Sequence, residues 1–380
     1  MYTIRGTWMR GGTSKCWLFN AVDIDPLVSS VGDLDTILTS AFGSGDPRQL
    51  DGIGGGSSTT SKAAIVRRSN QQGIDIDYLF AQVAIAERTV EWGSNCGNCA
   101  TAIGLYAVQA GLVPVQGDTT RVRMRNENTG AVLVAEVATA GGRVPYDGDA
   151  TVPGATAPGV PVGLTFENPA GSPAHLLPTG SPVDVLQPGR APYRATLVSA
   201  GAPAALVDPR NTDLGLHGAE SPRDMTAAVP ALVSLRREAA LQMGLSRPED
   251  PITHAIPKIG VASPAVDYTT TSGDRISAGD YDVSIRMLSM MAPHPAIGLT
   301  SAVAAAAAAS VQGTIIDRLT AHRISRSSLR IGTAAGIIPV DISTDDNGNL
   351  TGVTLHRAAR RIATAELFVS PLVRELAHSA

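Results

Sequence analysis

The sequence has few aromatic residues, few cysteines and no block of like charge. Aromatic side chains make up 4% of the 380 residues, and 30 lysines and arginines stand against 34 aspartates and glutamates, for a net charge of −4. Proteins that bind nucleic acid rely on stacking aromatics and basic patches, and this chain has neither feature. We therefore expect no nucleic-acid partner.

Signals for secretion and for membrane insertion are also missing. The first ten residues carry charge where a signal peptide has its apolar segment. Residues 295–316 contain no charged residue and are long enough to cross a bilayer, but their small Ala, Ser, Thr and Gly residues favour a helix enclosed by protein. We expect a cytoplasmic protein that does not contact a membrane and whose three cysteines are reduced.

The chain is long enough for two domains with a large core, since 43% of its residues are hydrophobic. Residues 141–192 are rich in Pro and Gly, which places a boundary there and predicts domains at residues 1–184 and 185–380. In each half, strands precede and follow a helix of small residues with a polar start, which predicts a duplicated α/β (α+β) fold. The expected strands are 2–8, 16–19, 63–67, 75–86, 120–126, 131–138, 162–166, 193–199, 204–207, 258–262, 282–288, 328–332 and 338–342, with an amphipathic helix near 231–243.

The stretch from Glu91 to Gly111 predicts a buried helix with a polar N-terminus. Around Asn95, Cys96 and Gly97 the first backbone N–H groups would lack intrahelical partners and carry the positive end of the helix dipole. Such a helix start binds carboxylates and makes a thiol more acidic. We expect Cys96 to act on a small organic acid held there.

Cys96 and Cys99 form a Cys-x-x-Cys pair, which allows other interpretations. At a helix start this pair can be a dithiol redox site, and either cysteine can instead be a packed core residue. A structural zinc site needs two more ligands, and the chain offers only Cys16 and scattered histidines. No metal site is predicted.

A long loop rich in Gly, Ser and Thr, residues 46–61, ends at Lys62. Its spacing does not fit a phosphate-binding Walker loop, because Ser61 stands where that motif has glycine before the lysine. It does not fit a dinucleotide fingerprint either, since the third small residue and the following helix pattern are missing. The loop is instead typical of a site where backbone amides approach a ligand closely.

Six short motifs occur in order along the chain: Met9–Ser14, Asp51–Lys62, Asn95–Asn98, Pro178–Gly180, Pro257–Ile259 and Leu288–Met290 with the nearby His294. Together they make the sequence resemble the PrpF family, which includes 2-methylaconitate isomerase, methylitaconate delta-isomerase, 4-oxalomesaconate tautomerase and aconitate isomerases. The resemblance implies a diaminopimelate-epimerase-like fold, with two similar domains that are each a curved, mostly antiparallel sheet around a central helix. It also implies a cleft between the domains and cofactor-independent proton transfer on unsaturated di- and tricarboxylic acids.

The resemblance makes Lys62 and Cys96 the catalytic candidates. Proton removal beside an unsaturated carboxylate creates a dienolate, so the site must hold an anion, supply a base and return a proton at the far end of the allylic system. We expect Lys62 to take the proton and Cys96 to deliver or relay one, an order that the sequence leaves open. Candidate substrate-binding residues are Arg10, Gly11, Thr13, Ser14, Gly55, Gly56, Ser57, Asn95, Gly97 and Asn98 from the first half and Ser272, Arg286 and His294 from the second.

Two departures from related enzymes affect the expected chemistry. All three cysteines lie in the first half, which excludes a racemisation with one thiol from each domain. The segment from Met290 to Ala296 lacks the basic residue that the family usually has beside its histidine, which indicates one fewer substrate carboxylate or a different anchoring mode.

The expected partner is a small polycarboxylate, and a homodimer is considered as the assembly. The alternatives are a non-catalytic carboxylate-binding protein, a dithiol redox protein and an amino-acid epimerase.

Overall fold

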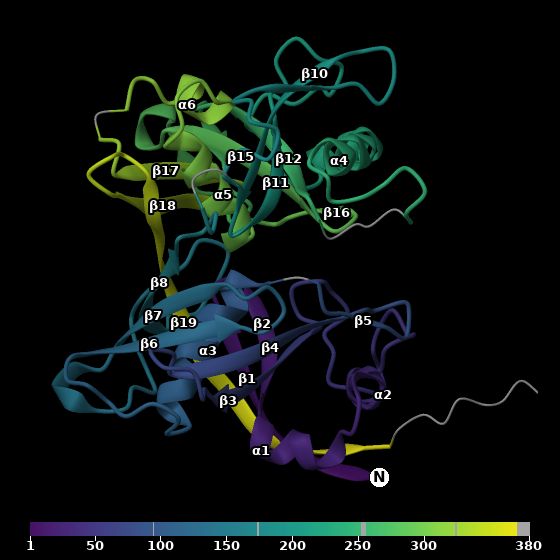
Figure 1. Ribbon diagram of the computed structural model, residues 1–380, viewed down its shortest axis with the longest axis vertical. Coiled ribbons are helices and arrows are strands. Elements are labelled where there is room, and N and C mark those ends of the chain that lie inside the picture. The colour runs from purple at the N-terminus through teal and green to yellow at the C-terminus, as the bar shows by residue number, and fades with distance from the viewer. Residues whose placement is uncertain (94, 173–174, 252–255, 324, 371–380) are drawn as a thin grey trace, which may run out of the picture.

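The computed structural model describes residues 1–93, 95–172, 175–251, 256–323 and 325–370. Two lobes lie one above the other in Figure 1, and each is a curved sheet around a buried helix. The first lobe contains β1 (Tyr2–Gly11), β2 (Ser14–Asn20), α1 (Ala21–Ile24), α2 (Val31–Phe42), β3 (Lys62–Arg68), β4 (Ile76–Val83), β5 (Val90–Glu91), α3 (Gly97–Gln109), β6 (Thr119–Asn126), β7 (Val132–Ala138) and β8 (Val160–Glu167). The second contains β9 (Asp184–Leu186), β10 (Tyr193–Ala200), β11 (Ala202–Val207), α4 (Val229–Gln242), β12 (Lys258–Pro264), β13 (Tyr268–Thr269), β14 (Arg275–Ile276), β15 (Val283–Ser289), β16 (Ala292–Pro293), α5 (Leu299–Ala309), α6 (Ile315–Leu319), β17 (Ser328–Thr333) and β18 (Gly336–Thr344).

The two lobes repeat one order of strand pairing. In the first lobe β1 and β2 form a hairpin, β2 runs parallel to β3, β3 is antiparallel to β4, and β4 runs parallel to β6. In the second, β10 and β11 form the hairpin, β11 is parallel to β12, β12 is antiparallel to β15, and β15 is parallel to β17. Helices α3 and α5 occupy the same place in this order, between the last two strands named in each lobe. The predicted duplication is therefore present in the topology.

The last strand, β19 (Leu350–Val369), joins the lobes. Its first residues pair with β18, its middle part with β8, and its second half with β1. It is the yellow strand that runs from the upper lobe to the lower one in Figure 1. The boundary expected at residues 184/185 stays a prediction, and residues 371–380 lie outside the described part.

The central helices consist of small residues because the strands wrap closely around them. Residues 97–108 of α3 and all of α5 are buried. A Cβ on Gly104 would lie 2.4 Å from the Cβ of Ala135 in β7, so only glycine fits there. The expected helix in residues 295–316 is shorter than the charge-free segment, because α5 ends at Ala309 and α6 begins after a turn at Ile315. No helix within the described ranges is long and apolar enough to span a bilayer.

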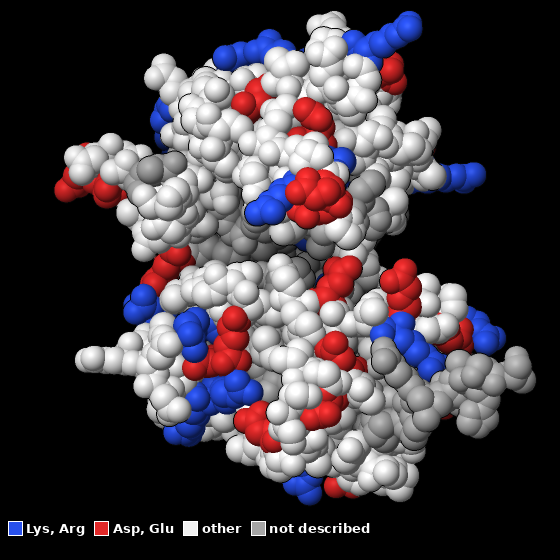
Figure 2. Space-filling view, turned by 45° about the vertical axis from the view of Figure 1, so that its right-hand side comes forward, with Lys and Arg blue, Asp and Glu red and all other residues white. Residues whose placement is uncertain are grey.

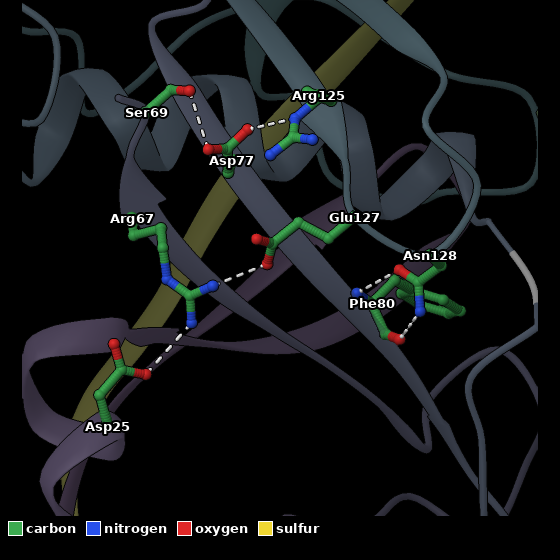
Figure 3. A network of polar contacts seen from close by, with 8 residues as sticks. All are labelled: Asp25, Arg67, Ser69, Asp77, Phe80, Arg125, Glu127 and Asn128. Carbon is green, nitrogen blue, oxygen red and sulfur yellow. Dashed lines mark hydrogen bonds and ion pairs between the residues drawn. The ribbon is translucent and has the colours of Figure 1, made fainter. Parts of the chain in front are cut away.

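A polar network fixes the strands of the first lobe against one another (Figure 3). Arg67 in β3 pairs with Asp25 at 3.1 Å and with Glu127 at 2.8 Å. Where the pairing of β4 with β6 stops, the Asn128 side chain replaces the strand partner: its Oδ1 accepts from the Phe80 N–H and its Nδ2 donates to the Phe80 carbonyl, both at 2.8 Å. This bond pair fixes β4 at Phe80, whose ring lies beside Lys62.

Candidate active site

A narrow cavity of about 70 Å³ lies where α3 and α5 begin, between the lobes. A wider cavity of about 490 Å³ adjoins it and shares Asn95 and Lys258 with it. Figure 2 shows the hollow between the two lobes from outside. The narrow cavity is lined by Ser14, Ser58, Thr59, Lys62, Phe80, Gln82, Glu91, Asn95, Cys96, Gly97, Asn98, Lys258, Leu288, Ser289, Met290, His294, Gly298, Leu299, Thr300 and Ser301.

The N-termini of the two central helices meet at this cavity. Cys96 is the N-cap residue of α3 and Gly298 is that of α5, and neither helix start has a side-chain capping bond. A Cβ on Gly97 would lie 2.6 Å from the Cβ of Leu299, so glycine allows the two helix starts to approach closely. Two sets of uncapped backbone N–H groups, each at the positive end of a helix dipole, therefore border one cavity, an arrangement suited to an anion.

Lys62 is the first residue of β3, and its side chain is 8% exposed. Its Nζ donates to Oε1 of Gln82, the residue directly opposite on β4, and lies 5.3 Å from the centre of the Phe80 ring. Gln82 is itself fixed, because its Nε2 donates to the Ser61 carbonyl at 3.0 Å. The amine is thus held in one orientation at the cavity wall.

The glycine-rich loop before Lys62 is tied down by Gln49. Its Nε2 donates to Oγ of Ser61 at 2.8 Å, and its Oε1 accepts from the N–H of Gly56 at 2.8 Å. A Cβ on Gly54 would lie 2.2 Å from this amide group. The loop's composition therefore serves close packing around Gln49, while Ser58 and Thr59 face the cavity.

The thiol of Cys96 lies in the cavity wall beside Cys99. The neighbouring Cys99 thiol and burial raise the pKa of Cys96 well above its usual value, although Lys62 acts in the opposite direction. The pKa of Cys96 is therefore shifted in the direction opposite to the one expected from its place at a helix start, because the second thiol and desolvation both favour the protonated form. Burial likewise raises the pKa of Cys99. Because dithiol redox sites depend on a low thiol pKa, this finding argues against the redox alternative.

His294 lines the cavity from the second lobe as a neutral imidazole. Its Nδ1 accepts from the N–H of Ala296 at 2.9 Å, so the ring proton is on Nε2. Burial, and then the charges of Lys62, Lys258 and Arg357, lower the pKa of His294 to about 3. The ring can therefore donate one hydrogen bond into the cavity.

Asn95 offers a second neutral donor. Its Oδ1 accepts from the hydroxyl of Tyr78 at 3.2 Å. Its Nδ2 is buried and has no hydrogen-bond partner among the residues that the structure describes. This amide can therefore donate a hydrogen bond to a ligand in the cavity.

Eight predicted binding residues line neither cavity. Gly11 and Thr13 lie beside the start of α3, and two of the other six are arginines with structural partners. Arg10 donates to the carbonyls of Gly12, Ala157 and Pro158 at 2.9–3.1 Å. These bonds tie the β1–β2 hairpin to the loop before β8. Arg286 is 2% exposed and donates to the Glu220, Ile285 and Gly332 carbonyls and to Ser284. Ser272 bonds to Asp274 in an exposed turn, and the remaining three are Gly55, Gly56 and Ser57.

Gly11 and Thr13 contact Asn98 in the first turn of α3 without lining the cavity. A Cβ on Gly11 would lie 2.0 Å from the Asn98 carbonyl oxygen, and Oγ1 of Thr13 accepts from Nδ2 of Asn98 at 3.2 Å. The predicted residues that line the cavity are Ser14, Lys62, Asn95, Cys96, Gly97, Asn98 and His294.

Gln82, Glu91 and Lys258 also line the cavity but were not predicted as site residues, although Lys258 lies within the Pro257–Ile259 motif. Gln82 could be found only through its cross-strand pairing with Lys62. Lys258 lies in the other lobe, on a strand far along the chain, so its approach to Lys62 depends on how the lobes pack.

Known proteins resemble this chain over nearly its whole length. The family model described as PrpF protein matches residues 1–370. The 2-methyl-aconitate isomerase of Shewanella oneidensis is 35% identical over 378 residues, covering 94% of each chain. A solved structure of methylitaconate-delta-isomerase is 31% identical with a TM-score of 0.80, covering 97% of this chain and 95% of that one.

A more distant structure shares the fold alone. A probable proline racemase from Agrobacterium radiobacter superposes with a TM-score of 0.52 at 11% identity, covering 98% of this chain and 94% of its own. Together with the closer match, this likeness confirms the predicted mixed fold of two similar sheets around central helices, of the diaminopimelate-epimerase-like class.

Proposed function

Since the chain belongs to the PrpF family and is an isomerase, we propose that it moves a proton along the allylic system of an unsaturated di- or tricarboxylic acid, with Lys62 and Cys96 as the proton-transferring groups. The observation that carries this proposal is the joint position of the two groups. The Lys62 amine and the Cys96 thiol line one cavity that is bordered by two uncapped helix starts.

The substrate's carboxylates bind at these helix starts. A carboxylate accepts hydrogen bonds from unpaired backbone N–H groups and is stabilised by the helix dipole. The Nδ2 of Asn95 and the Nε2 of His294 add neutral donors. The same donors stabilise the dienolate, because its negative charge spreads onto the carboxylate oxygens as the proton leaves.

The proton transfer needs one base and one acid. The Lys62 amine, acting as the base in its unprotonated form, takes the proton from the carbon beside the unsaturated carboxylate, and the electron pair of the broken C–H bond delocalises into the dienolate. The Cys96 S–H bond then breaks and its proton bonds to the far carbon of the allylic system, which moves the double bond; the proton on Lys62 returns to the Cys96 thiolate, directly or through solvent, before the next turnover. Cys96 suits the role of donor, since its raised pKa keeps the thiol protonated. No electron is gained or lost overall, so the proposed reaction needs no redox cofactor.

The names of the relatives favour acids of the methylaconitate and methylitaconate type as substrates. The proposal places this activity in the cytoplasm, where the three free cysteines stay reduced. A non-catalytic carboxylate-binding protein is the alternative that the cavity also fits, and only turnover separates the two.

Proton NMR in D₂O tests the proposal directly. Purified protein is incubated with cis-aconitate, trans-aconitate, 2-methylaconitate, itaconate, methylitaconate and 4-oxalomesaconate, beside a Lys62→Met variant. We expect deuterium incorporation or a new isomer with at least one acid, and neither in the variant. Ligand-induced thermal stabilisation without exchange or isomerisation for any acid would favour the binding protein.

A further inference from the structure

The repeated topology gives Lys62 a counterpart in the second lobe. Lys62 is the first residue of β3, which runs parallel to β2 and antiparallel to β4. Lys258 is the first residue of β12, which runs parallel to β11 and antiparallel to β15. Both strands begin at the cavity, and both lysines line it. The two amines therefore reach the site from opposite lobes.

Lysine is rare in this chain, which makes the pair informative. Of the 30 basic residues only Lys15, Lys62 and Lys258 are lysines, and the others are arginines. The Nζ of Lys15 lies 4.4 Å from the centre of the Trp8 ring, away from the cavity. Lysine carries a compact point charge on a flexible stem, whereas arginine needs room for a planar fork. A narrow cavity that must also hold a substrate has space for the smaller group.

The two amines differ in their partners. Lys62 donates to Gln82, which stands directly opposite on β4. Continuing the register of β12 and β15 puts Ser289 opposite Lys258, and the Ser289 hydroxyl lies 3.1 Å from that of Ser58. Among the residues that the structure describes, no hydrogen-bond acceptor and no carboxylate within ion-pair distance contacts the Lys258 ammonium.

The charge around Lys258 is predominantly positive. Lys62 and Arg236 are the cations that act on it, Glu91 is the one carboxylate among the lining residues, and the Cys96 thiol also faces this space. Burial first, and then the Lys62 charge, lower the pKa of Lys258 to about 8. His294 is uncharged. The site therefore lacks the negative charge that would balance its ammonium groups, and a polycarboxylate supplies it.

We infer that the Lys258 ammonium binds a carboxylate of the substrate from the second lobe, opposite the lysine that moves the proton. This assignment rests on the proposed function only in taking the ligand to be a polycarboxylate. It deepens that proposal, because an acid bound in this way has one carboxylate at the helix starts and a further one at Lys258. It also supplies the cation that the segment around His294 lacks.

Calorimetry with propane-1,2,3-tricarboxylate tests the assignment without turnover, since this saturated acid has no double bond to move. We expect Lys258→Met to weaken binding about 10- to 100-fold, the effect of losing one charged hydrogen bond. Lys258→Arg should keep part of the affinity because it keeps the charge, and Lys15→Met is the matched control that should bind like the wild type. The Lys258→Met protein should unfold at no lower temperature than the wild type, because it loses a partly buried ammonium that has no hydrogen-bond or ion-pair partner among the described residues.

Turnover of the acid identified by NMR separates anchoring from proton transfer. We expect Lys258→Met to raise KM and to change kcat only a few-fold. A fall in kcat at unchanged affinity would make Lys258 an acid or base instead, and unchanged affinity and kcat would overturn the assignment. Wild-type protein that binds the tricarboxylate but isomerises no acid would contradict the proposed function alone, whereas wild-type protein that binds no polycarboxylate would overturn the assignment as well.

The pH dependence of wild-type affinity gives a second measurement that needs no variant. Lys258 loses its charge as the pH rises through about 8 in the free protein. Affinity for the tricarboxylate should therefore be highest below pH 8 and fall above it, and Lys258→Arg should remove this fall. Affinity that stays constant from pH 7 to pH 9.5 would contradict the assignment even if Lys258→Met does not fold.

Discussion

The two lobes share their strand order but not their chemistry at the cavity. At the start of the central helix the first lobe has Cys96 and the second has Gly298. At the start of the equivalent strand the first lobe has Lys62, held by Gln82, and the second has Lys258, which has no hydrogen-bond or ion-pair partner within the described part of the chain. The duplicated backbone thus supplies two helix starts and two amines, and the differences between the lobes assign proton transfer to the first and anchoring to the second.

The largest expected effect comes from the first-lobe lysine. Lys62→Met should lower kcat by at least about 10³-fold, because the substrate loses its base. Affinity for propane-1,2,3-tricarboxylate should change less than about tenfold, since the helix starts and Lys258 remain. Steady-state kinetics and calorimetry measure the two quantities, with Lys15→Met as control. A near-normal kcat for the Lys62→Met enzyme would rule out Lys62 as the base.

The two cysteines of the first lobe should differ next most strongly. Cys96→Ala should lower kcat about 10²- to 10³-fold, because the protonated thiol that returns the proton is gone. Cys99→Ala should leave kcat within a few-fold and only lower stability, since Cys99 is a buried core residue. Equal losses in both variants would favour the dithiol interpretation over the proposed one.

Gln82 is the feature that distinguishes the environment of Lys62 from that of Lys258. Gln82→Met should lower kcat about 10- to 100-fold and leave KM nearly unchanged, because the amine loses its fixed orientation while the carboxylate donors stay in place. Gln109→Met removes a comparable bond from α3 at its far end, to the Pro145 carbonyl, and serves as the matched control. A rise in KM with unchanged kcat would place Gln82 in substrate binding instead.

The smallest predicted effect is on stability, and it differs between the glycines at the two helix starts. A Cβ on Gly97 would lie 2.6 Å from that of Leu299, whereas one on Gly298, at φ −68°, would meet only the Ser301 Oγ at 3.6 Å. Gly97→Ala should therefore lower the free energy of unfolding by about 1–3 kcal/mol, and Gly298→Ala should change it by less than about 0.5 kcal/mol. Thermal or urea unfolding measures both, and equal effects would contradict the close approach of the helix starts.

Much of the fold follows from local sequence patterns. The small, charge-free stretch with a polar start and a glycine stop predicts α3 close to its observed limits, since these signals are properties of the helix itself. Helix α2 was not predicted, although Ser30 and Asp33 form a capping box at its start and Gly43 ends it in a left-handed conformation. Strand β19 was not predicted either, because its run Ala358–Arg361 does not alternate as a half-buried strand does.

Only part of the site was predictable, because local motifs mark some of its residues while others depend on contacts between distant parts of the chain. Lys62, Cys96 and the helix start are marked by their own motifs. Arg10 and Arg286 are also strong carboxylate ligands by residue type, but backbone carbonyls engage them, and no local pattern shows that. Lys258 is the opposite case, because its importance depends on the packing of one lobe against the other.

The most direct test of this division between the lobes compares Lys62→Met and Lys258→Met side by side, with kcat from NMR turnover and affinity from calorimetry on the same preparations. We predict opposite losses: Lys62→Met has a lower kcat and keeps its affinity, and Lys258→Met has a lower affinity and keeps its kcat. If both variants lose the same quantity, the two lysines share one role, and the division between a proton-transferring lobe and an anchoring lobe is wrong.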